Sequence, residues 1–386
     1  MSIPPTHPVQ GTPPSPASPA TSPGIPPRSL EDIAGLVLRF EPIWAAAALT
    51  LVILSYVLGR NACLPWVGLL LAAAPFPLRR LRVGYWARSS HFDLPIAILL
   101  VGALVGLIVS PDRTISLGAF QLTLAMTLFY FSFVSYPNPA LLIKRAMALG
   151  LVILGLCVIL VYVDPHPFSG RPDMQLNANH GFAMTLILTL AVVAGMVLFH
   201  TNMRLRLVGG LFCIAVFVGV FVMTDKGSES IRSLFSLVSF ENRIPIWRET
   251  ISMLGESPAT GLGLGCWLFR YVEYYPMSHY THVHNAYLEL YSNTGVFGAA
   301  ALVATLVIGY KLAMDIFRAP RHHPWYGFGI GVVSACALAI LIGVIETAPT
   351  GMPIVAPNTY YYLVSPVPWF LGILLLSAHR LIRQSD

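Results

Sequence analysis

The chain has 386 residues, of which 56% are hydrophobic and only 10% are charged, with a formal net charge of +6. Soluble domains carry about 25% charged residues, so this deficit excludes an ordinary soluble protein and indicates lipid as the surrounding solvent. The basic residues fall between apolar runs and form no continuous patch, which excludes nucleic acid as the partner. The five cysteines have no CxxC spacing, so we expect neither a disulfide framework nor a zinc site.

The N-terminal segment is rich in proline, serine and threonine. Residues 1–29 have too few apolar side chains to bury a core, so we expect them to be disordered. They also lack the apolar segment of a signal peptide, and the first apolar run is expected to act as an uncleaved insertion signal. We therefore predict a disordered cytoplasmic tail at 1–39 and a transmembrane domain at 40–386.

The apolar runs predict an all-α integral membrane protein, because about 20 consecutive apolar residues span a bilayer as a helix. Ten such runs are found, at 40–59, 62–78, 93–110, 115–136, 141–163, 181–200, 205–224, 286–310, 325–346 and 359–379. The longest polar connection, residues 225–285, is expected to contain short helices.

The distribution of Lys and Arg predicts the orientation, because cytoplasmic loops of membrane proteins carry an excess of both. With the N-terminus in the cytoplasm, 15 of the 23 basic residues fall on the cytoplasmic side and 8 on the other. Both termini are therefore predicted to be cytoplasmic, in a bacterial inner membrane. Six of the eight outer basic residues lie in the connections 164–180 and 225–285. They either bind an anion at the outer surface or are simply solvated in long loops.

The strongest candidate for chemistry is the segment that opens the eighth predicted span. His284 is a candidate general base, since imidazole titrates near neutral pH; alternatively it only caps the helix. Asn285 and Glu289 are four residues apart and share a helix face. A metal site built on His282 and His284 is disfavoured, because no third ligand stands at a suitable spacing.

A second candidate lies upstream, at Asn242–Glu249. Pro245 fits the first turn of a helix, and that helix is expected to lie along the membrane surface. Its apolar face is predicted to carry Trp247, Ile251 and Leu254. Arg243, just before this turn, is suited to bind a phosphate through two parallel hydrogen bonds, or alternatively extends to lipid headgroups.

Two further segments add small or polar residues. The glycines of residues 257–265 allow a tight turn and close approach of the backbone to a ligand, and their spacing is not that of a dinucleotide-binding motif. Asn179, in the segment leading into the sixth span, is a good helix cap.

In this order, the features resemble the O-antigen ligase and O-antigen polymerase superfamily, whose members are integral-membrane, GT-C-like glycosyltransferases. The ligase signature is His, then Asn, Ser or Gln, nine residues, Gly, two residues and Gly. It matches His284-Asn285, Gly295 and Gly298. An Arg-x-x-x-aromatic element matches Arg243 with Trp247, and a Pro-x-x-Gly-x-Gly-x-Gly turn matches residues 258–265. The resemblance covers roughly residues 170–310.

The resemblance implies transfer of a glycan from an undecaprenyl-diphosphate carrier to lipid A–core at the periplasmic face. The alternative is a polymerase that joins repeat units on a glycan acceptor. A transporter is disfavoured, because the spans are nearly free of charge. We expect an inverting enzyme without cofactor or metal. The implied catalytic residues are His284 and Arg243, and the implied diphosphate-binding cations are Arg171, Arg243, Lys226 and Arg248. Supporting roles fall to Asn285, Glu289, His282, Asn179, Gly261 and Gly263.

Overall fold

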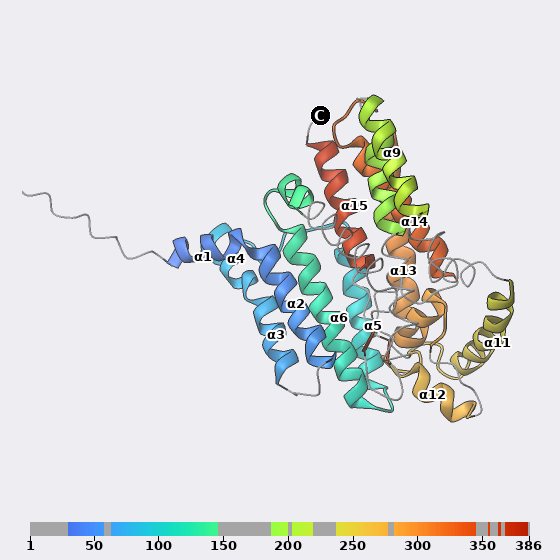
Figure 1. Ribbon diagram of the computed structural model, residues 1–386. Coiled ribbons are helices and arrows are strands. Elements are labelled where there is room, and N and C mark those ends of the chain that lie inside the picture. Colours follow the sequence, from blue (N-terminus) through green and yellow to red (C-terminus); the bar gives the residue numbers. More distant parts are fainter. Residues whose placement is uncertain are drawn as a thin grey trace, which may run out of the picture.

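The computed structural model describes residues 30–57, 63–145, 187–199, 203–218, 237–276, 282–344, 354–355, 362–363 and 367–384. Its labelled helices (Figure 1) are α1 (Leu30–Arg39), α2 (Glu41–Val57), α3 (Leu64–Ala73), α4 (Pro75–Val83), α5 (Asp93–Ile108), α6 (Arg113–Val134), α9 (Met203–Phe217), α11 (Leu237–Leu254), α12 (Trp267–Tyr274), α13 (Ala286–Arg318), α14 (Tyr326–Gly343) and α15 (Val367–Arg383). Two-residue strands, β1 (Ile354–Val355) and β2 (Tyr362–Leu363), pair antiparallel with Ile354 opposite Leu363. Apart from this short ladder, the predicted all-α class is confirmed.

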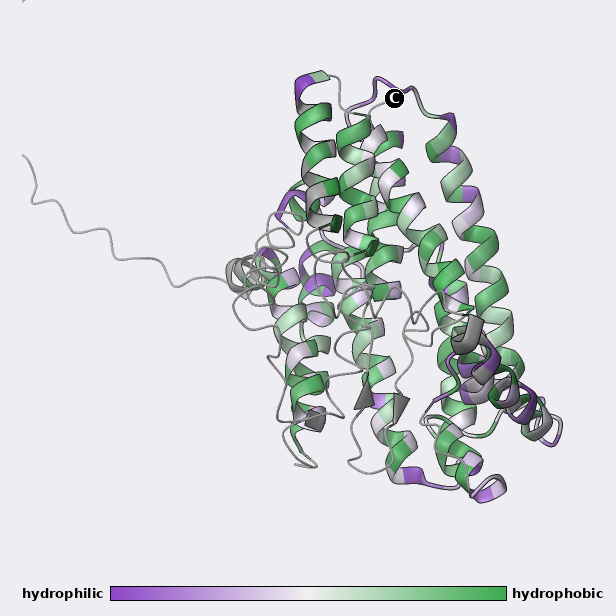
Figure 2. Cartoon of the chain, turned by 45° about the vertical axis from the view of Figure 1, so that its right-hand side comes forward, coloured by the Kyte–Doolittle hydropathy of each residue, from purple (hydrophilic) through white to green (hydrophobic). Residues whose placement is uncertain are grey.

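The helices have the apolar composition of membrane spans. Among the described residues, α6, α13 and α14 are long and apolar enough to cross a membrane, and shorter apolar helices cover Glu41–Tyr56, Asp93–Ile108 and Ile187–Leu198. Hydrophobic residues, green in Figure 2, predominate along the bundle. The chain is an all-α membrane protein. The number of ten spans stays a prediction, because most of the fifth, 141–163, lies outside the described residues.

The predicted span at 62–78 is two helices instead of one. α3 ends at Ala73, and Pro75 begins α4. The ten residues of α3 rise about 15 Å, roughly half of the hydrocarbon thickness. Pro75 has no N–H with which to continue the hydrogen bonds of α3, so a separate helix starts there. α4 then ends at Gly84, whose φ of 83° is left-handed.

The prediction of disorder was also wrong for the last ten residues of the tail. Leu30–Arg39 form α1, which packs on α4 at the left of Figure 1. Apolar residues three and four positions apart make this helix amphipathic, and its Ala34 is buried. Residues 1–29 lie outside the described residues.

The bundle has one large apolar core. Its buried side chains include residues of α2, α3, α5, α6, α13, α14 and α15; representatives are Val52, Leu69, Ile96, Leu122, Ile316, Val332 and Leu376. The tenth predicted span, 359–379, begins later, at Val367, since Pro368 favours the first turn of a helix. The eighth, 286–310, continues to Arg318.

The turns between helices gather at two ends of the bundle. At one end, Arg380 donates hydrogen bonds to the carbonyls of Val134 (2.8 Å) and Ser89 (3.1 Å). The other end holds the loop between α9 and α13, where α11 and α12 lie beside the lower part of α13 in Figure 1. Turns that are predicted to lie on the same side of the membrane therefore lie at the same end of the bundle. Which end faces the periplasm stays a prediction.

Candidate functional site

The N-terminus of α13 presents the two histidines. Asn285 is the N-cap: its Oδ1 accepts hydrogen bonds from the N–H groups of Tyr287 (3.0 Å) and Leu288 (2.9 Å). His284 precedes the cap, so the alternative in which His284 itself caps the helix is wrong. The ring centroids of His282 and His284 are 3.7 Å apart.

The backbone at His284 is unusual. Its φ is 52°, the one positive value outside glycine among the described residues. This left-handed conformation costs a non-glycine residue about 1–2 kcal/mol, so the surrounding contacts hold it in place. On one side of it, the Val283 carbonyl accepts a hydrogen bond from Trp247 Nε1 at 3.0 Å. On the other, the Asn285 amide donates to the Val344 carbonyl at 2.8 Å. The backbone of His284 is thus held between two anchored neighbours.

A buried carboxylate lies one turn into α13. Glu289 is 2% exposed, and its Oε1 accepts a hydrogen bond from Asn293 Nδ2 at 2.8 Å. Among the described residues, its Oε2 has no hydrogen-bond partner. His282 interacts with the carboxylate electrostatically. A carboxyl group removed from water needs hydrogen-bond partners, and the Asn293 amide supplies one of them.

α13 is interrupted at Gly295, where φ is 60° and ψ is −145°. This region is essentially restricted to glycine. The interruption leaves carbonyl and N–H groups of α13 without partners in the helix, and the turn at residues 257–265 forms hydrogen bonds with them. The Leu262 N–H donates to the Ser292 carbonyl at 2.7 Å, and the Val296 N–H donates to the Ala259 carbonyl at 3.2 Å. Gly295 of the ligase signature therefore breaks α13 into two helical parts.

The glycine turn that fills this break is formed by residues 257–265. Gly261, Gly263 and Gly265 have φ values of 74°, 104° and 72°, so all three are left-handed. A Cβ on Gly261 would lie 2.5 Å from the Ser292 carbonyl oxygen. The tight turn is present as predicted, but the backbones that it approaches closely are those of α13 and of α5 with the turn after it.

α11 places Arg243 differently from the prediction. The helix begins at Leu237, so Pro245 lies inside it and not in its first turn. Pro245 has no N–H to donate to the Glu241 carbonyl four residues earlier. Both residues are exposed, so this unpaired carbonyl is at the surface of the helix. Arg243 is only 7% exposed, which does not fit a side chain extending to lipid headgroups.

The buried face of α11 also differs. Ile246, Thr250 and Met253 are buried on the same stripe as Arg243, at intervals of three and four residues. Of the three residues predicted for the apolar face, Leu254 is buried and Trp247 packs against the same core, but Ile251 is 58% exposed. Trp247, one turn after Arg243, donates to the Val283 carbonyl. In the Arg-x-x-x-aromatic element, the buried Arg243 therefore lies one turn of α11 before the tryptophan that is hydrogen-bonded to the histidine segment.

This geometry can be set beside known proteins. Residues 176–303 match the model of the O-antigen ligase family. No curated protein matches the chain. The match contains the histidine pair, the glycine turn, the broken helix and Arg243, and it confirms the resemblance seen in the sequence. It indicates a glycosyltransferase-like enzyme of the bacterial inner membrane that uses lipid-linked glycans in lipopolysaccharide or other surface-glycan biosynthesis.

Within the O-antigen ligase segment, the loop between α9 and α13 has its own small core. Ile246, Leu262 and Val283 are buried together there with the aromatic pair Trp267 and Tyr271. The two rings stack with centroids 4.5 Å apart, and Trp267 Nε1 donates to Thr250 Oγ1 at 3.0 Å. This core holds α11 against the start of α13, so Arg243 and His284 belong to one packed unit.

One polar residue of the O-antigen ligase segment was missed from the sequence. Asn293 is fully buried; it donates to Glu289 and accepts a hydrogen bond from the Gly265 N–H. It therefore connects the carboxylate to the glycine turn. Its position four residues after Glu289, on the same helix face, is the signal that was available.

The structure does not place the other predicted diphosphate-binding cations beside Arg243. Arg248 is exposed, about 140° around α11 from the buried Arg243. Arg171, Lys226 and Asn179 lie outside the described residues. Across the described ranges, no three His, Cys, Asp or Glu side chains form a group that could hold a metal ion.

Proposed function

We propose that this protein is an O-antigen ligase that moves a glycan from an undecaprenyl-diphosphate carrier to lipid A–core at the periplasmic face. The observation that carries the proposal is the family match at 176–303, which contains both the signature residue His284 and the buried Arg243. Lipid-linked glycans are the substrates that this family implies. A buried guanidinium suits a diphosphate, and an anchored imidazole suits an acceptor hydroxyl.

The reaction follows from these two groups. The acceptor hydroxyl oxygen attacks the anomeric carbon, and its proton passes to His284. The bond from the anomeric carbon to the diphosphate oxygen breaks, and undecaprenyl diphosphate leaves with the electron pair. A single displacement of this kind inverts the anomeric configuration. The leaving group needs charge neutralisation rather than a proton, so we propose that guanidinium groups serve where other enzymes use a metal ion.

Arg243 is the principal candidate for the diphosphate. It lies on the buried stripe of α11, where charge interactions are stronger than in water. Its planar fork can bind two phosphate oxygens at once. Arg171, Lys226 and Arg248 remain further candidates for the same diphosphate, since one guanidinium neutralises only part of its charge.

Glu289 and His282 support the base in this proposal. In this proposal an ionised Glu289, held by Asn293, stabilises the positive charge that forms when the imidazole accepts a proton. Glu289 acts through the histidines and not on the substrate, so it is a positioning residue. Glu289→Gln retains an acceptor for Asn293 but removes the charge. Its signature should be a changed pH dependence of turnover with an unchanged folded yield; an unaltered pH profile would leave Glu289 a purely structural role.

Deletion of the gene decides between ligase and polymerase. If the enzyme is a ligase, the lipopolysaccharide should lose all long chains on a gel while polymer accumulates on the lipid carrier. A core that carries one repeat unit would identify the polymerase instead. Unchanged lipopolysaccharide and unchanged surface glycan would contradict both. The complementing copy should carry wild-type or His284→Asn protein, so that any restored phenotype is assigned to the site.

A further inference from the structure

A pocket opens at the α1–α4 end of the molecule, at the opposite end from α12 and the glycine turn. It has a volume of about 510 Å³. Four separate segments line it: α1, the first turn of α2, α4 with the turn after it, and the turn after α6. Because these segments come from distant parts of the sequence, the pocket exists only in the folded bundle.

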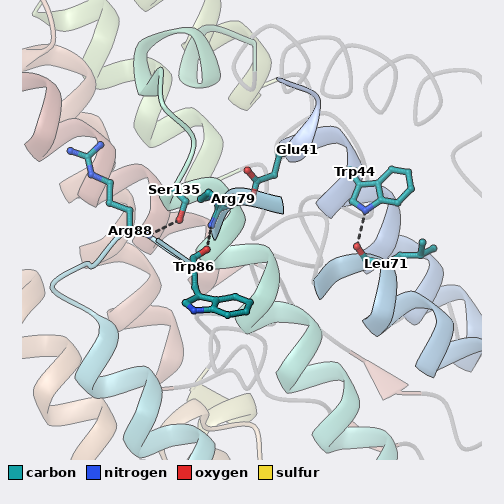
Figure 3. A network of polar contacts seen from close by, with 7 residues as sticks. All are labelled: Glu41, Trp44, Leu71, Arg79, Trp86, Arg88 and Ser135. Atoms are coloured by element: carbon teal, nitrogen blue, oxygen red, sulfur yellow. Dashed lines mark hydrogen bonds and ion pairs between the residues drawn. The ribbon is translucent and has the colours of Figure 1, made fainter. Parts of the chain in front are cut away.

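A buried ion pair forms part of the pocket wall. Arg79 and Glu41 are 3% and 2% exposed at their side chains and are paired directly. Arg79 also donates to the Trp86 carbonyl at 2.6 Å, and Figure 3 shows its guanidinium between these two partners. Nearby, the Arg88 N–H donates to Ser135 Oγ at 2.9 Å. Glu41 is the one carboxylate among the lining residues, and Arg79 neutralises it.

Two lining arginines remain uncompensated. Arg39, at the end of α1, and Arg82, on α4, are both exposed, and neither forms an ion pair with any described residue. Arg82 Nη1 lies 2.7 Å from where a Cβ on Gly35 would be, so the guanidinium lies directly over α1. The absence of a side chain at Gly35 makes room for it. Within the described part of the chain, the pocket therefore presents two positive charges without a counterion.

The surface next to this pocket is apolar. Phe40, Ile43, Leu81 and Trp86 are 51%, 64%, 77% and 59% exposed, and each is on or beside a lining helix. Aromatic residues next to arginines are typical of the membrane–water interface. A ligand here would meet two cations in a pocket and hydrocarbon-like side chains at its edge. That combination fits a molecule with an anionic head and an apolar tail.

We propose that this pocket binds the phosphate headgroup of an anionic phospholipid, held by Arg39 and Arg82 while the acyl chains lie along α2 and α4. Basic pockets between helices recognise such headgroups, and each basic residue contributes about a fivefold gain in affinity at an anionic membrane surface. The site is separate from His284 and does not depend on the proposed function.

The test uses the full chain purified in detergent. Phosphatidylglycerol with brominated acyl chains is titrated, and quenching of tryptophan fluorescence reports binding near Trp44 and Trp86. Brominated phosphatidylcholine measures non-specific association, and inorganic phosphate is added as a competitor. The test variant is Arg39→Gln/Arg82→Gln. The matched control, Arg318→Gln/Arg321→Gln, removes two exposed positive charges outside the pocket, one at the last residue of α13 and one in the turn after it.

We expect wild type to prefer phosphatidylglycerol and the test variant to bind it about 25-fold more weakly, from about fivefold for each arginine. The control variant should stay within about twofold of wild type, and Arg39→Lys/Arg82→Lys should keep most of the affinity. Equal quenching by both lipids would overturn the proposal. So would an equal loss in the control variant, or displacement of the lipid by inorganic phosphate at comparable concentrations, which would identify a free-phosphate site.

Discussion

Arginine is used in two different ways in the two regions where it is most informative. In the loop between α9 and α13, Arg243 is buried on the inner stripe of α11, one turn before Trp247, which is hydrogen-bonded to the histidine segment. At the α1–α4 end, Arg39 and Arg82 are exposed around a pocket that is bordered by apolar residues. Burial strengthens an electrostatic contact but makes it costly to leave unused, whereas exposure favours reversible binding of a headgroup. The first arrangement suits catalysis and the second suits membrane attachment.

The backbone follows the same division. Left-handed conformations occur at His284, Gly295 and the three glycines of the turn that packs against α13. At the α1–α4 end, Gly84 alone has a positive φ among the described residues, and it terminates a helix in the usual way. Strained backbone persists only where the surrounding structure holds it, and it clusters at functional sites. The loop end is therefore the end at which a precise geometry is maintained.

The comparison of the two ends depends most strongly on the orientation of the chain in the membrane. A reporter that is active only in the periplasm should be active when fused after Ser278, in the loop, and silent when fused after Pro320, in the turn after α13. The expected difference is all-or-none, because it reflects which compartment the fusion reaches. The opposite pattern would place His284 in the cytoplasm and remove the proposed reaction.

His284→Ala is expected to give the next largest effect, a loss of roughly 10²–10⁴-fold in turnover if the imidazole is the base. His284→Asn is the sharper variant, because Asn tolerates the left-handed backbone and yet cannot act as a base at neutral pH. Turnover of purified protein with lipid-linked donor and acceptor, normalised to folded protein, measures both. His282→Ala should be much milder.

An active His284→Asn enzyme would end the assignment of the base. The same assay with chelator present tests the proposed metal independence. Turnover abolished by chelator and restored by a divalent ion would require a metal in the mechanism and would return His282 and His284 to consideration as ligands.

Arg243→Ala should lower turnover by about 10²-fold, which corresponds to about 3 kcal/mol of transition-state stabilisation. Arg243→Lys should recover little of it, because a point charge cannot form two parallel hydrogen bonds. Since Arg243 is buried, folded yield must be measured for both variants. Arg270→Ala is the control: it removes an exposed charge that pairs with Glu273 in the same loop and should change turnover by less than about twofold. Near-normal turnover of Arg243→Ala would remove the diphosphate assignment.

Gly295→Ala tests whether the loop end depends on its strained backbone. A Cβ there would lie 2.2 Å from the Ala259 carbonyl oxygen, in a conformation essentially restricted to glycine. We expect a loss of at least about 1–3 kcal/mol in stability, measured as a lower thermal midpoint and folded yield. Gly309→Ala is the matched control on the same helix, since nothing lies within 4 Å of its Cβ position. Equal effects of the two substitutions would show that the break at Gly295 is dispensable.

The sequence predicted the residue types of the site better than their local geometry. His284, Arg243 and the glycines were found because their spacing is a local property of the chain. The broken helix was not found, because Gly295 in an apolar run also fits ordinary helix packing. Pro245 was placed in a first turn because proline favours that position, but its exposure allows it inside α11. The face of α11 depended on tertiary contacts with Val283 and Trp267, which no local pattern contains.

The pocket at the α1–α4 end could not be predicted from the sequence either. Its arginines were recognised as cytoplasmic charge, but α1 was taken for part of the tail, and α3 and α4 were read as one span. The pocket requires that α1 forms and that α4 is a separate helix from α3, because Arg39 and Arg82 then come together from segments 43 residues apart. Pro75 provided the signal for the boundary between α3 and α4.

Asn285 gives the smallest expected effect and the clearest separation of structure from chemistry. Its side chain accepts from two N–H groups of α13 and donates to the Val344 carbonyl, so it anchors the helix start without itself being a base. Asn285→Ala should cost about 1 kcal/mol of stability, the usual value for a lost N-cap. Asn285→Ser should restore most of that, because Ser caps well although it is too short to keep the link to Val344.

Thermal midpoints and turnover per folded molecule together make the distinction. For Asn285→Ala, the midpoint should fall while turnover per folded molecule stays within a few-fold of wild type. For His284→Asn, the midpoint should hold while turnover collapses. If Asn285→Ala lost as much turnover per folded molecule as His284→Asn, the two residues would form a single catalytic unit, and the division between an anchoring cap and a reacting imidazole would have to be given up.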